Sequence, residues 1–415
     1  MRSPPLSAVL AILATIPLHS QAPAAAPPDI VRPLPRPAGR FRVGTTVVYL
    51  TDSARVDSDY AADRPITLQL WYPANRLPTT RAPYLIEPGL DSVLLTGYYG
   101  VDSSAIHAWS ALRTSSGLDA PAAAGRHPLL TFSVGLGVIR ANYTSLAEAM
   151  ASRGYVVALV ESPGAGLMVR PEARVVQDTT NRLDTPAFHR AAVAAWAGDV
   201  SFALDRLQAA DLPPAAAAVA RTVDWSRVGA AGHSSGGLVA IAACERDPRV
   251  RACIDLDGGM AAPTGEPIAD FVSTGLSKPT LLLRSKPIYS DADFARRGIT
   301  RAEWEKRGAG GQAGQDSLVA RSKGTLWVGS IAGTGHFSFT DAPFVMPSTI
   351  SRFGGKIIKP ERGLVVTTAA MRAFLDQELS GRAGRLGALP QHYPELTLQP
   401  AGRAVSPVRP PSPAR

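Results

Sequence analysis

The run GHSSG at residues 232–236 is the strongest chemical signal in the sequence. It matches the pattern G-x-S-x-G, in which a serine stands at a sharp turn from a strand into a helix. The apolar residues 228–231 predict a strand before the run, and residues 238–242 predict a helix after it. Ser234 is centred between the two glycines, so we expect Ser234, and not Ser235, to be a nucleophile. The alternative is a glycine-rich turn that packs tightly and has no chemical role.

A serine nucleophile needs a histidine that takes its proton. Only His336 and His392 follow Ser234 in the chain, and a histidine is expected last in the order serine, acid, histidine. His336 lies in a glycine-containing loop directly after a predicted strand, whereas His392 lies in a proline-rich stretch near the C-terminus. We therefore expect His336 to be the base and His392 to be an exposed bystander.

The carboxylate that would orient His336 is less well defined by the sequence. Asp255 and Asp257 lie at the end of the strand predicted after the serine turn, and Asp291 and Asp293 follow the next strand. Strand alternation places Asp255 and Asp257 on one face, with Asp257 at the tip before two glycines. Spacing alone leaves Asp257 and Asp291 equally eligible, with Asp255 as a salt-bridge or capping residue.

Two backbone N–H groups are needed to hold the negative oxygen that forms when a serine attacks a carbonyl. We expect one of them from Ser235, the residue after the nucleophile. The other is expected from the loop SVGLG at residues 133–137, where Leu136 is the natural donor because the flanking glycines free the backbone. The alternative for this loop is an ordinary strand-to-helix turn.

The elements that must position these residues alternate along the chain. The apolar patterns predict strands at 41–50, 66–72, 129–133, 155–161, 228–232, 252–256, 280–284 and 325–331, and helices at 141–153, 192–209, 236–245 and 364–379. The first two strands predict an antiparallel pair. The later alternation favours one α/β domain with a mostly parallel sheet and helices on both faces. Residues 73–126 are predicted to be irregular and rich in turns and aromatic side chains, namely Tyr84, Tyr98, Tyr99 and Trp109.

The two ends of the chain differ in composition from the domain between them. Residues 1–24 contain one early arginine, an apolar run at 6–18 and an A-x-A-type site at 22–24, which indicates a cleaved signal peptide and a secreted or periplasmic protein. An uncleaved anchor is the alternative. Residues 25–40 are a proline-rich leader, residues 41–385 the catalytic domain, and residues 386–415 a proline- and arginine-rich tail predicted to be disordered.

The composition of the 415 residues fits a protein with a sizeable core, because 45% of them are hydrophobic and 19% charged. The net charge of +9 is scattered along the chain, which argues against nucleic acid as a partner and leaves weak contact with anionic membrane surfaces as a minor alternative. Cys244 and Cys253 are too few for a disulfide scaffold, and two buried free thiols are favoured over a disulfide. No phosphate loop, metal-ligand cluster or nucleotide motif appears, so no cofactor or metal is expected.

Several runs resemble the platelet-activating factor acetylhydrolase family, the plasma-type lipoprotein-associated phospholipases. The resemblance covers roughly residues 41–380, and its most specific parts are the serine turn and the aspartate strand. The similar runs are the oxyanion loop at 127–137, the nucleophile turn at 232–237, the aspartate strand at 254–257, the histidine loop at 335–337 and the opening strands at 42–44 and 68–73.

The resemblance implies an α/β-hydrolase fold, no cofactor and Asp257 as the acid. It further implies a secreted serine esterase that cleaves short-acyl esters, with short-chain phospholipids among them. Two departures concern the acyl pocket: Val134 stands where the family has histidine, and Ser235 replaces a bulky aromatic residue. Because backbone amides hold the oxyanion, these changes bear on the substrate and not on catalysis.

Other functions fit the same residues. A peptidase or a polyester hydrolase would use the same triad, since the fold does not define the substrate. A catalytically silent acyl-binding relative would have no need of intact serine, aspartate and histidine. We expect the segment 73–126 to fold over the carboxyl edge of the sheet and to confine the pocket to acyl groups of about two to six carbons. The competing interpretation is that losing the aromatic residue at 235 widens the pocket.

Overall fold

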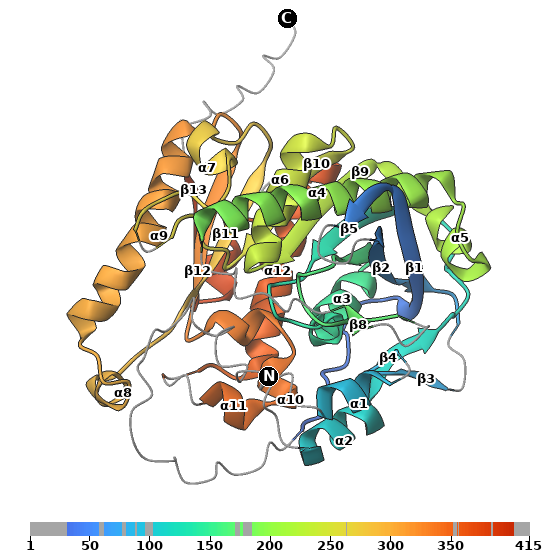
Figure 1. Ribbon diagram of the computed structural model, residues 1–415, viewed down its shortest axis with the longest axis horizontal. Helices are drawn as coiled ribbons and strands as arrows, with labels where there is room; N and C mark the ends of the chain where they lie inside the picture. The colour runs from blue at the N-terminus through green and yellow to red at the C-terminus, as the bar shows by residue number, and fades with distance from the viewer. Residues whose placement is uncertain are drawn as a thin grey trace, which may run out of the picture.

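An eleven-stranded sheet forms the centre of the molecule in the computed structural model (Figure 1). The structure describes residues 31–401 apart from 58–61, 77–79, 88, 96–102, 171–174, 177–184, 263, 352–354, 356 and 383–384. The strand order is β13-β12-β11-β10-β9-β5-β6-β2-β1-β4-β3, and neighbours from β12 to β6 run parallel. A two-stranded sheet, β7-β8, is separate.

The strands of the large sheet are β1 (Arg42–Asp57), β2 (Ala62–Ala74), β3 (Arg81–Pro83), β4 (Arg113–Leu118), β5 (His127–Ser133), β6 (Val156–Glu161), β9 (Val223–His233), β10 (Val250–Leu256), β11 (Thr280–Lys286), β12 (Leu326–Ala332) and β13 (Leu396–Ala401). The small sheet pairs β7 (Met168–Val169) with β8 (Val175–Val176). The strand β6 reads VVALVE and is buried throughout, as expected of a parallel strand covered on both faces.

Helices cover both faces of this sheet. On one face α3 (Thr144–Ala151) packs against α12 (Pro360–Ser380), and on the other α4 (Pro186–Ala209) packs against α6 (Ser235–Arg246). The remaining helices are α1 (Leu90–Leu95), α2 (Ser103–Ala111), α5 (Pro214–Ala220), α7 (Phe271–Thr274), α8 (Asp291–Arg296), α9 (Arg301–Arg321), α10 (Ala342–Val345), α11 (Pro347–Ser351) and α13 (Leu389–His392), with 3₁₀ turns η1 (Arg140–Tyr143) and η2 (His336–Phe339).

The predicted α/β architecture is confirmed, including the antiparallel pair β1-β2 and the alternation from β5 to β12. The prediction that residues 73–126 are irregular was wrong, because this segment contains β3, β4, α1 and α2. These elements are short and gain their stability from packing and not from local periodicity. The long helix α9 was also missed, since its sequence is polar and contains several glycines.

The predicted tail is ordered over its first part. Residues 386–401 carry α13 and β13, and β13 pairs antiparallel with the edge strand β12. Leu386 and Leu396 are buried, so this part of the chain contributes to the core despite its prolines. The leader is attached as well: Leu34 is buried, and the Arg32 amide donates to the Phe344 carbonyl at 2.9 Å.

A second apolar cluster lies beside the main core, and we call the four helices α1, α2, α10 and α11 that form most of it the cap. Trp109 on α2 is fully buried, and its indole N–H donates to the Val345 carbonyl of α10 at 2.9 Å. Ile139 and Phe337, which follow the oxyanion loop and the histidine respectively, also contact the cluster. The segment 73–126 therefore packs against the loops at the carboxyl edge of the sheet.

Some expectations concern residues that the structure does not describe. The signal peptide at 1–24, Tyr98, Tyr99 and residues 402–415 lie outside the described residues. Within the described part of the chain, no helix combines the length and the apolar character that crossing a bilayer requires. Cys244 and Cys253 are both buried and free.

Candidate active site

Ser234 stands at the turn between β9 and α6 in a strained backbone conformation. Its φ of 56° and ψ of −129° lie in a region that residues with a side chain rarely adopt. The turn requires glycine on both sides of it. A Cβ at Gly232 would lie 2.0 Å from the Gly236 carbonyl oxygen, and one at Gly236 would lie 2.2 Å from that of Ser133. The two glycines therefore allow the close approach that presents Ser234 at the edge of the sheet.

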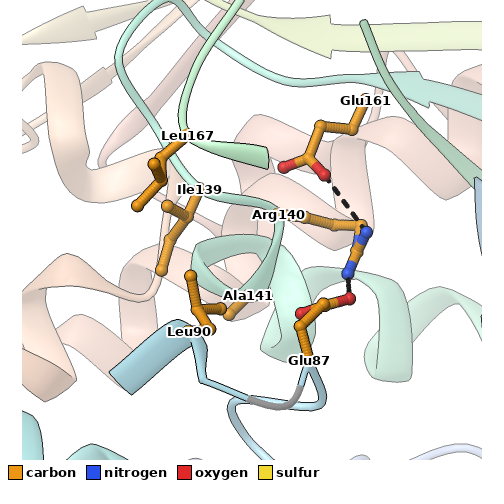
Figure 2. A pocket seen from close by; sticks show the side chains of 7 residues that line it. All are labelled: Glu87, Leu90, Ile139, Arg140, Ala141, Glu161 and Leu167. Carbon is orange, nitrogen blue, oxygen red and sulfur yellow. Dashed lines mark hydrogen bonds and ion pairs between the residues drawn. The ribbon is translucent and has the colours of Figure 1, made fainter. Parts of the chain in front are cut away.

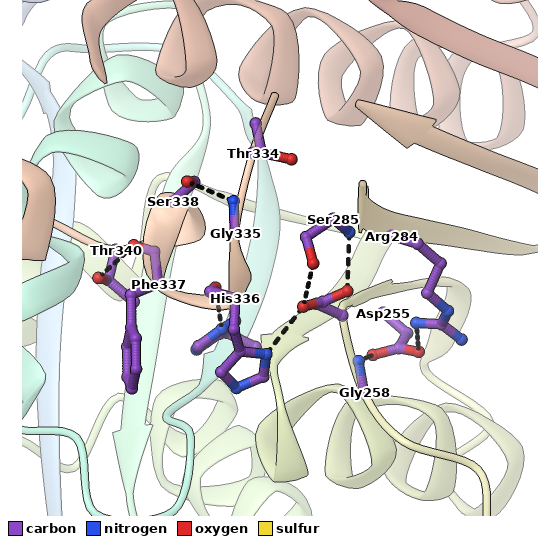
Figure 3. Close-up of polar contacts among 12 residues, drawn as sticks. Asp255, Gly258, Arg284, Ser285, Thr334, Gly335, His336, Phe337, Ser338 and Thr340 are labelled. Atoms are coloured by element: carbon purple, nitrogen blue, oxygen red, sulfur yellow. Dashed lines mark hydrogen bonds and ion pairs between the residues drawn. The ribbon is translucent and has the colours of Figure 1, made fainter. Parts of the chain in front are cut away.

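Asp257 follows β10 and also has a positive φ, of 61°. Its carboxylate accepts the Ser285 amide at 2.7 Å and the Ser285 hydroxyl at 2.8 Å, both from the neighbouring strand β11. Three contacts thus hold the carboxylate, because the His336 ring approaches it as well (Figure 3). Burial alone would raise the pKa of Asp257, but the hydrogen bond and charge of His336, the Ser285 amide and the Arg284 charge together outweigh burial, so the net pKa lies below its ordinary value.

His336 begins η2, directly after the glycine loop that follows β12. Its Nδ1 lies 2.8 Å from Oδ2 of Asp257, and 21% of its side chain is exposed. Since a carboxylate only accepts, Nδ1 carries the proton of this hydrogen bond, and Nε2 of the neutral ring is left as a base. This arrangement suits a histidine that takes a proton from a hydroxyl.

The other candidate carboxylates are engaged elsewhere. Asp255 is fully buried, accepts the Gly258 amide at 2.9 Å and pairs with Arg284 (Figure 3). Burial raises its pKa, and the Arg284 charge opposes this effect. The side chain of Asp291 is 94% exposed at the start of α8 and pairs with Arg301 on α9 at 3.0 Å. Asp293 caps the N-terminus of α8.

In the described part of the chain, the amides of Leu136 and Ser235 have no hydrogen-bond acceptor. In the oxyanion loop, the Gly135, Gly137 and Val138 amides are used within the protein. Among the described residues, none accepts from the Leu136 amide. Ser235 is the first residue of α6, where an amide has no partner inside the helix. His392, the other late histidine, is exposed on α13.

Sequence analysis missed two residues that connect these loops. Tyr143 and His233 are fully buried, and the Tyr143 hydroxyl lies 3.0 Å from His233 Nδ1. His233 Nε2 lies 3.0 Å from the His336 carbonyl oxygen, and the two imidazole rings are 4.6 Å apart. The position of His233 inside the GHSSG run was a usable signal, whereas nothing in the sequence marked Tyr143.

A second buried polar group lies behind the oxyanion loop. Arg140 donates to Gln69 at 2.8 Å and to Glu161 at 3.2 Å, and it also pairs with Glu87. Figure 2 shows it between the two glutamates, beside a small pocket that has room for no more than about one water molecule. The other residues that line the pocket are Leu90, Ile139, Ala141 and Leu167. The pocket is therefore separate from Ser234, Asp257 and His336, and its arginine is already neutralised.

A mostly parallel sheet with a strained serine at the end of β9 and a carboxylate-bound histidine after β12 defines the α/β-hydrolase class. The chain belongs to the family described as platelet-activating factor acetylhydrolase, isoform II, whose model matches residues 32–165 and 215–384. The resemblance to this family is thus confirmed.

The sequence identity between this chain and individual relatives is low. The chain is 26% identical over 258 residues to a probable 1-alkyl-2-acetylglycerophosphocholine esterase of Arthroderma benhamiae, with 59% of this chain and 61% of that protein covered. It is 24% identical over 288 residues to the platelet-activating factor acetylhydrolase of Gallus gallus, with 61% and 63% covered. The chain therefore spans about three-fifths of the length of these curated relatives. Among solved structures, it is similar to a ferulic acid esterase from Streptomyces cinnamoneus, with a TM-score of 0.70, 28% identity, and 89% of this chain and 99% of the other covered.

Proposed function

We propose that this protein is a serine-dependent carboxylic ester hydrolase in which Ser234, His336 and Asp257 form the catalytic triad. The observation that carries the proposal is the 2.8 Å contact between His336 and Asp257 beside the serine turn. The carbonyl of His336 is hydrogen bonded at 3.0 Å to His233, the residue before Ser234, so the histidine loop lies against that turn. Family membership and the esterase names of the relatives agree with this function.

The proposed reaction proceeds through an acyl-enzyme. As Ser234 Oγ forms a bond to the ester carbonyl carbon, His336 Nε2 takes the hydroxyl proton and Asp257 stabilises the resulting imidazolium. The amides of Leu136 and Ser235 hold the tetrahedral oxyanion. When the C–O bond to the alcohol breaks, the proton passes from His336 to the departing alkoxide. Water then attacks the acyl-enzyme with His336 as base, which releases the carboxylic acid and restores Ser234.

The substrate class that we propose is esters with short acyl groups, including phospholipids with a short sn-2 chain. Two relatives are named for acetyl-ester cleavage, and the cap packs against Ile139 and Phe337 beside the catalytic loops. A covered site of this kind favours small acyl groups. Aryl esters are a second candidate, because the ferulic acid esterase is similar over nearly its whole length. From residues 1–24 we expect the protein to be secreted or periplasmic.

The test is an activity panel with a nucleophile variant. Nitrophenyl esters of two to sixteen carbons, short-chain phospholipids and methyl ferulate are compared for kcat/KM. We expect Ser234→Ala to lower hydrolysis about 10³-fold or more, because triad members act as a unit. The control is Ser273→Ala, which changes an exposed serine on α7. A fluorophosphonate should label the wild type and not Ser234→Ala. Full turnover by a folded Ser234→Ala variant would exclude this function.

A further inference from the structure

A chain of hydrogen bonds joins the three loops of the site through two buried side chains. The Gly135 amide lies 2.9 Å from the Tyr143 hydroxyl, and that hydroxyl lies 3.0 Å from His233 Nδ1. On its other side, His233 Nε2 lies 3.0 Å from the His336 carbonyl oxygen. The chain therefore runs from the oxyanion loop to the histidine loop and passes through the residue next to Ser234.

The proton positions in this chain are determined by its two ends. The Gly135 amide can only donate, so the Tyr143 oxygen accepts there. The His336 carbonyl can only accept, so His233 Nε2 carries the ring proton. Burial and the neighbouring His336 lower the pKa of His233 to about 3, which keeps the ring neutral in this tautomer. With the ring neutral and its proton on Nε2, Nδ1 accepts the hydroxyl proton of Tyr143, so every donor in the chain has one acceptor.

Close packing reinforces the chain. A Cβ added to Gly135 would lie 3.1 Å from both His233 Nδ1 and the Tyr143 oxygen, so a larger residue there would require the pair to shift by a few tenths of an ångström. The Tyr143 ring packs on Phe132 of β5 at 5.0 Å between ring centroids. Loss of the hydroxyl would leave the Gly135 amide and His233 Nδ1 unpaired in a buried site, which is unfavourable for both polar groups.

We propose that Tyr143 and His233 are positioning residues. They hold the oxyanion amide of Leu136 and the ring of His336 at fixed positions relative to Ser234. Neither residue touches the reacting atoms. Tyr143 acts through Gly135, the neighbour of Leu136, and His233 acts through the backbone of His336. Because both effects concern groups used in the transition state, they act on kcat more than on KM. This inference rests on the proposed esterase function.

The test measures kcat, KM and Tm for full-length variants with nitrophenyl acetate. We expect Tyr143→Phe to lower kcat about 10- to 100-fold and to change KM less than about threefold. The matched control is Tyr72→Phe, because the Tyr72 hydroxyl is also buried and donates to a backbone carbonyl, that of Ala120 at 2.7 Å, away from the catalytic loops. Tyr72→Phe should lower Tm and leave kcat near the wild-type value.

Two variants of His233 provide a second measurement if Tyr143→Phe fails to fold. The Gln side chain of His233→Gln can still donate to the His336 carbonyl, whereas His233→Leu removes both hydrogen bonds. We expect kcat to fall in the order wild type, His233→Gln, His233→Leu, with KM nearly constant. Equal activity of the two variants, or wild-type kcat in a folded Tyr143→Phe, would overturn the inference.

The outcome is distinguishable from failure of the proposed function. If Ser234→Ala retains activity, the esterase proposal fails irrespective of Tyr143. If Ser234→Ala is inactive while Tyr143→Phe and His233→Leu turn over at the wild-type rate, only the positioning roles are refuted.

Discussion

Replacing each candidate acid by asparagine should separate the roles of Asp257, Asp255 and Asp291. Asn is nearly isosteric with Asp, so the three substitutions remove a charge without removing volume. The structure assigns a different environment to each carboxylate: Asp257 contacts His336, Asp255 is buried and pairs with an arginine, and Asp291 is exposed. The three substitutions should therefore separate a loss of activity from a loss of stability.

At position 257 the expected loss is catalytic. The Asn oxygen can still accept the Ser285 amide that now bonds at 2.7 Å, so the loop should keep its shape. The Asn amide group would then face His336 and donate to Nδ1, which moves the ring proton to Nε2 and leaves no lone pair toward Ser234. A wrong tautomer of this kind costs about 10⁴-fold in kcat in serine proteases. We expect a loss of about 10³- to 10⁴-fold with Tm nearly unchanged.

At position 255 the expected loss is one of stability. Asp255 is fully buried and pairs with Arg284, and removal of one partner of a fully buried pair costs roughly 3–5 kcal/mol. The Arg284 side chain is 18% exposed, so solvent reduces this cost. Asn still accepts the Gly258 amide, so the lower end of that range applies and Tm should fall clearly. Activity per folded molecule should remain within about tenfold of the wild type. Asp291→Asn should change neither quantity, because the side chain is 94% exposed.

The assay is hydrolysis of nitrophenyl acetate at pH 8, with Tm measured on the same preparations. Circular dichroism on the same preparations gives the folded fraction to which the rates are normalised. If Asp291→Asn lost activity and Asp257→Asn did not, the acid would lie after β11, and the argument from the His336 contact would be refuted.

Three further predictions concern the substrate, the serine turn and a buried acid. The value of kcat/KM should fall for acyl groups beyond about six carbons, and a steady rise to sixteen carbons, above the micelle threshold, would contradict the confined pocket. Gly236→Ala should greatly lower Tm and activity, because its Cβ would lie 2.2 Å from the Ser133 carbonyl oxygen. Gly308→Ala on α9 has open space around it and should stabilise the protein by about 1 kcal/mol. Equal Tm values for these two variants would refute the steric argument. Burial raises the pKa of Asp341 from 3.8 to about 8, so the folded state binds this proton more tightly than the unfolded chain, and the free energy of unfolding should decrease as pH rises from about 4 to about 8. Asp341→Asn should therefore reduce the slope of Tm against pH over that range, whereas the control Asp291→Asn should not. Parallel profiles for the wild type and Asp341→Asn would show that the Asp341 carboxylate does not cause the pH dependence.

The site was predictable to the extent that its chemistry depends on local backbone geometry. Gly232 and Gly236 flank Ser234 because a strand that turns sharply into a helix leaves no room for a Cβ, and that requirement is visible in the run itself. His336 was predictable for a related reason, since it is preceded by a glycine loop at the end of an apolar strand. The strand-helix alternation likewise follows from apolar periodicity, which is a local property of the chain.

Contacts between distant segments decided what the sequence left open. Spacing did not separate Asp257 from Asp291, because both follow strands; only the packing of β10 beside β11 places Asp257 on Ser285 and leaves Asp291 in solvent. The proline-rich end looked unable to fold, yet β13 pairs with the open edge of β12, whose backbone groups are unsatisfied without it.

The cap and the Tyr143–His233 pair required tertiary structure for the same physical reason. Trp109 and Val345 are hydrogen bonded across 236 positions of sequence, and Tyr143 and His233 across 90. A single sequence carries no record of which distant residues meet, because burial and hydrogen bonding between them arise only when the whole sheet has assembled. The sequence by itself determined the strand-helix alternation, the serine turn and the two candidate acids. The assembled fold determined which acid meets the histidine and how the three loops are placed relative to one another.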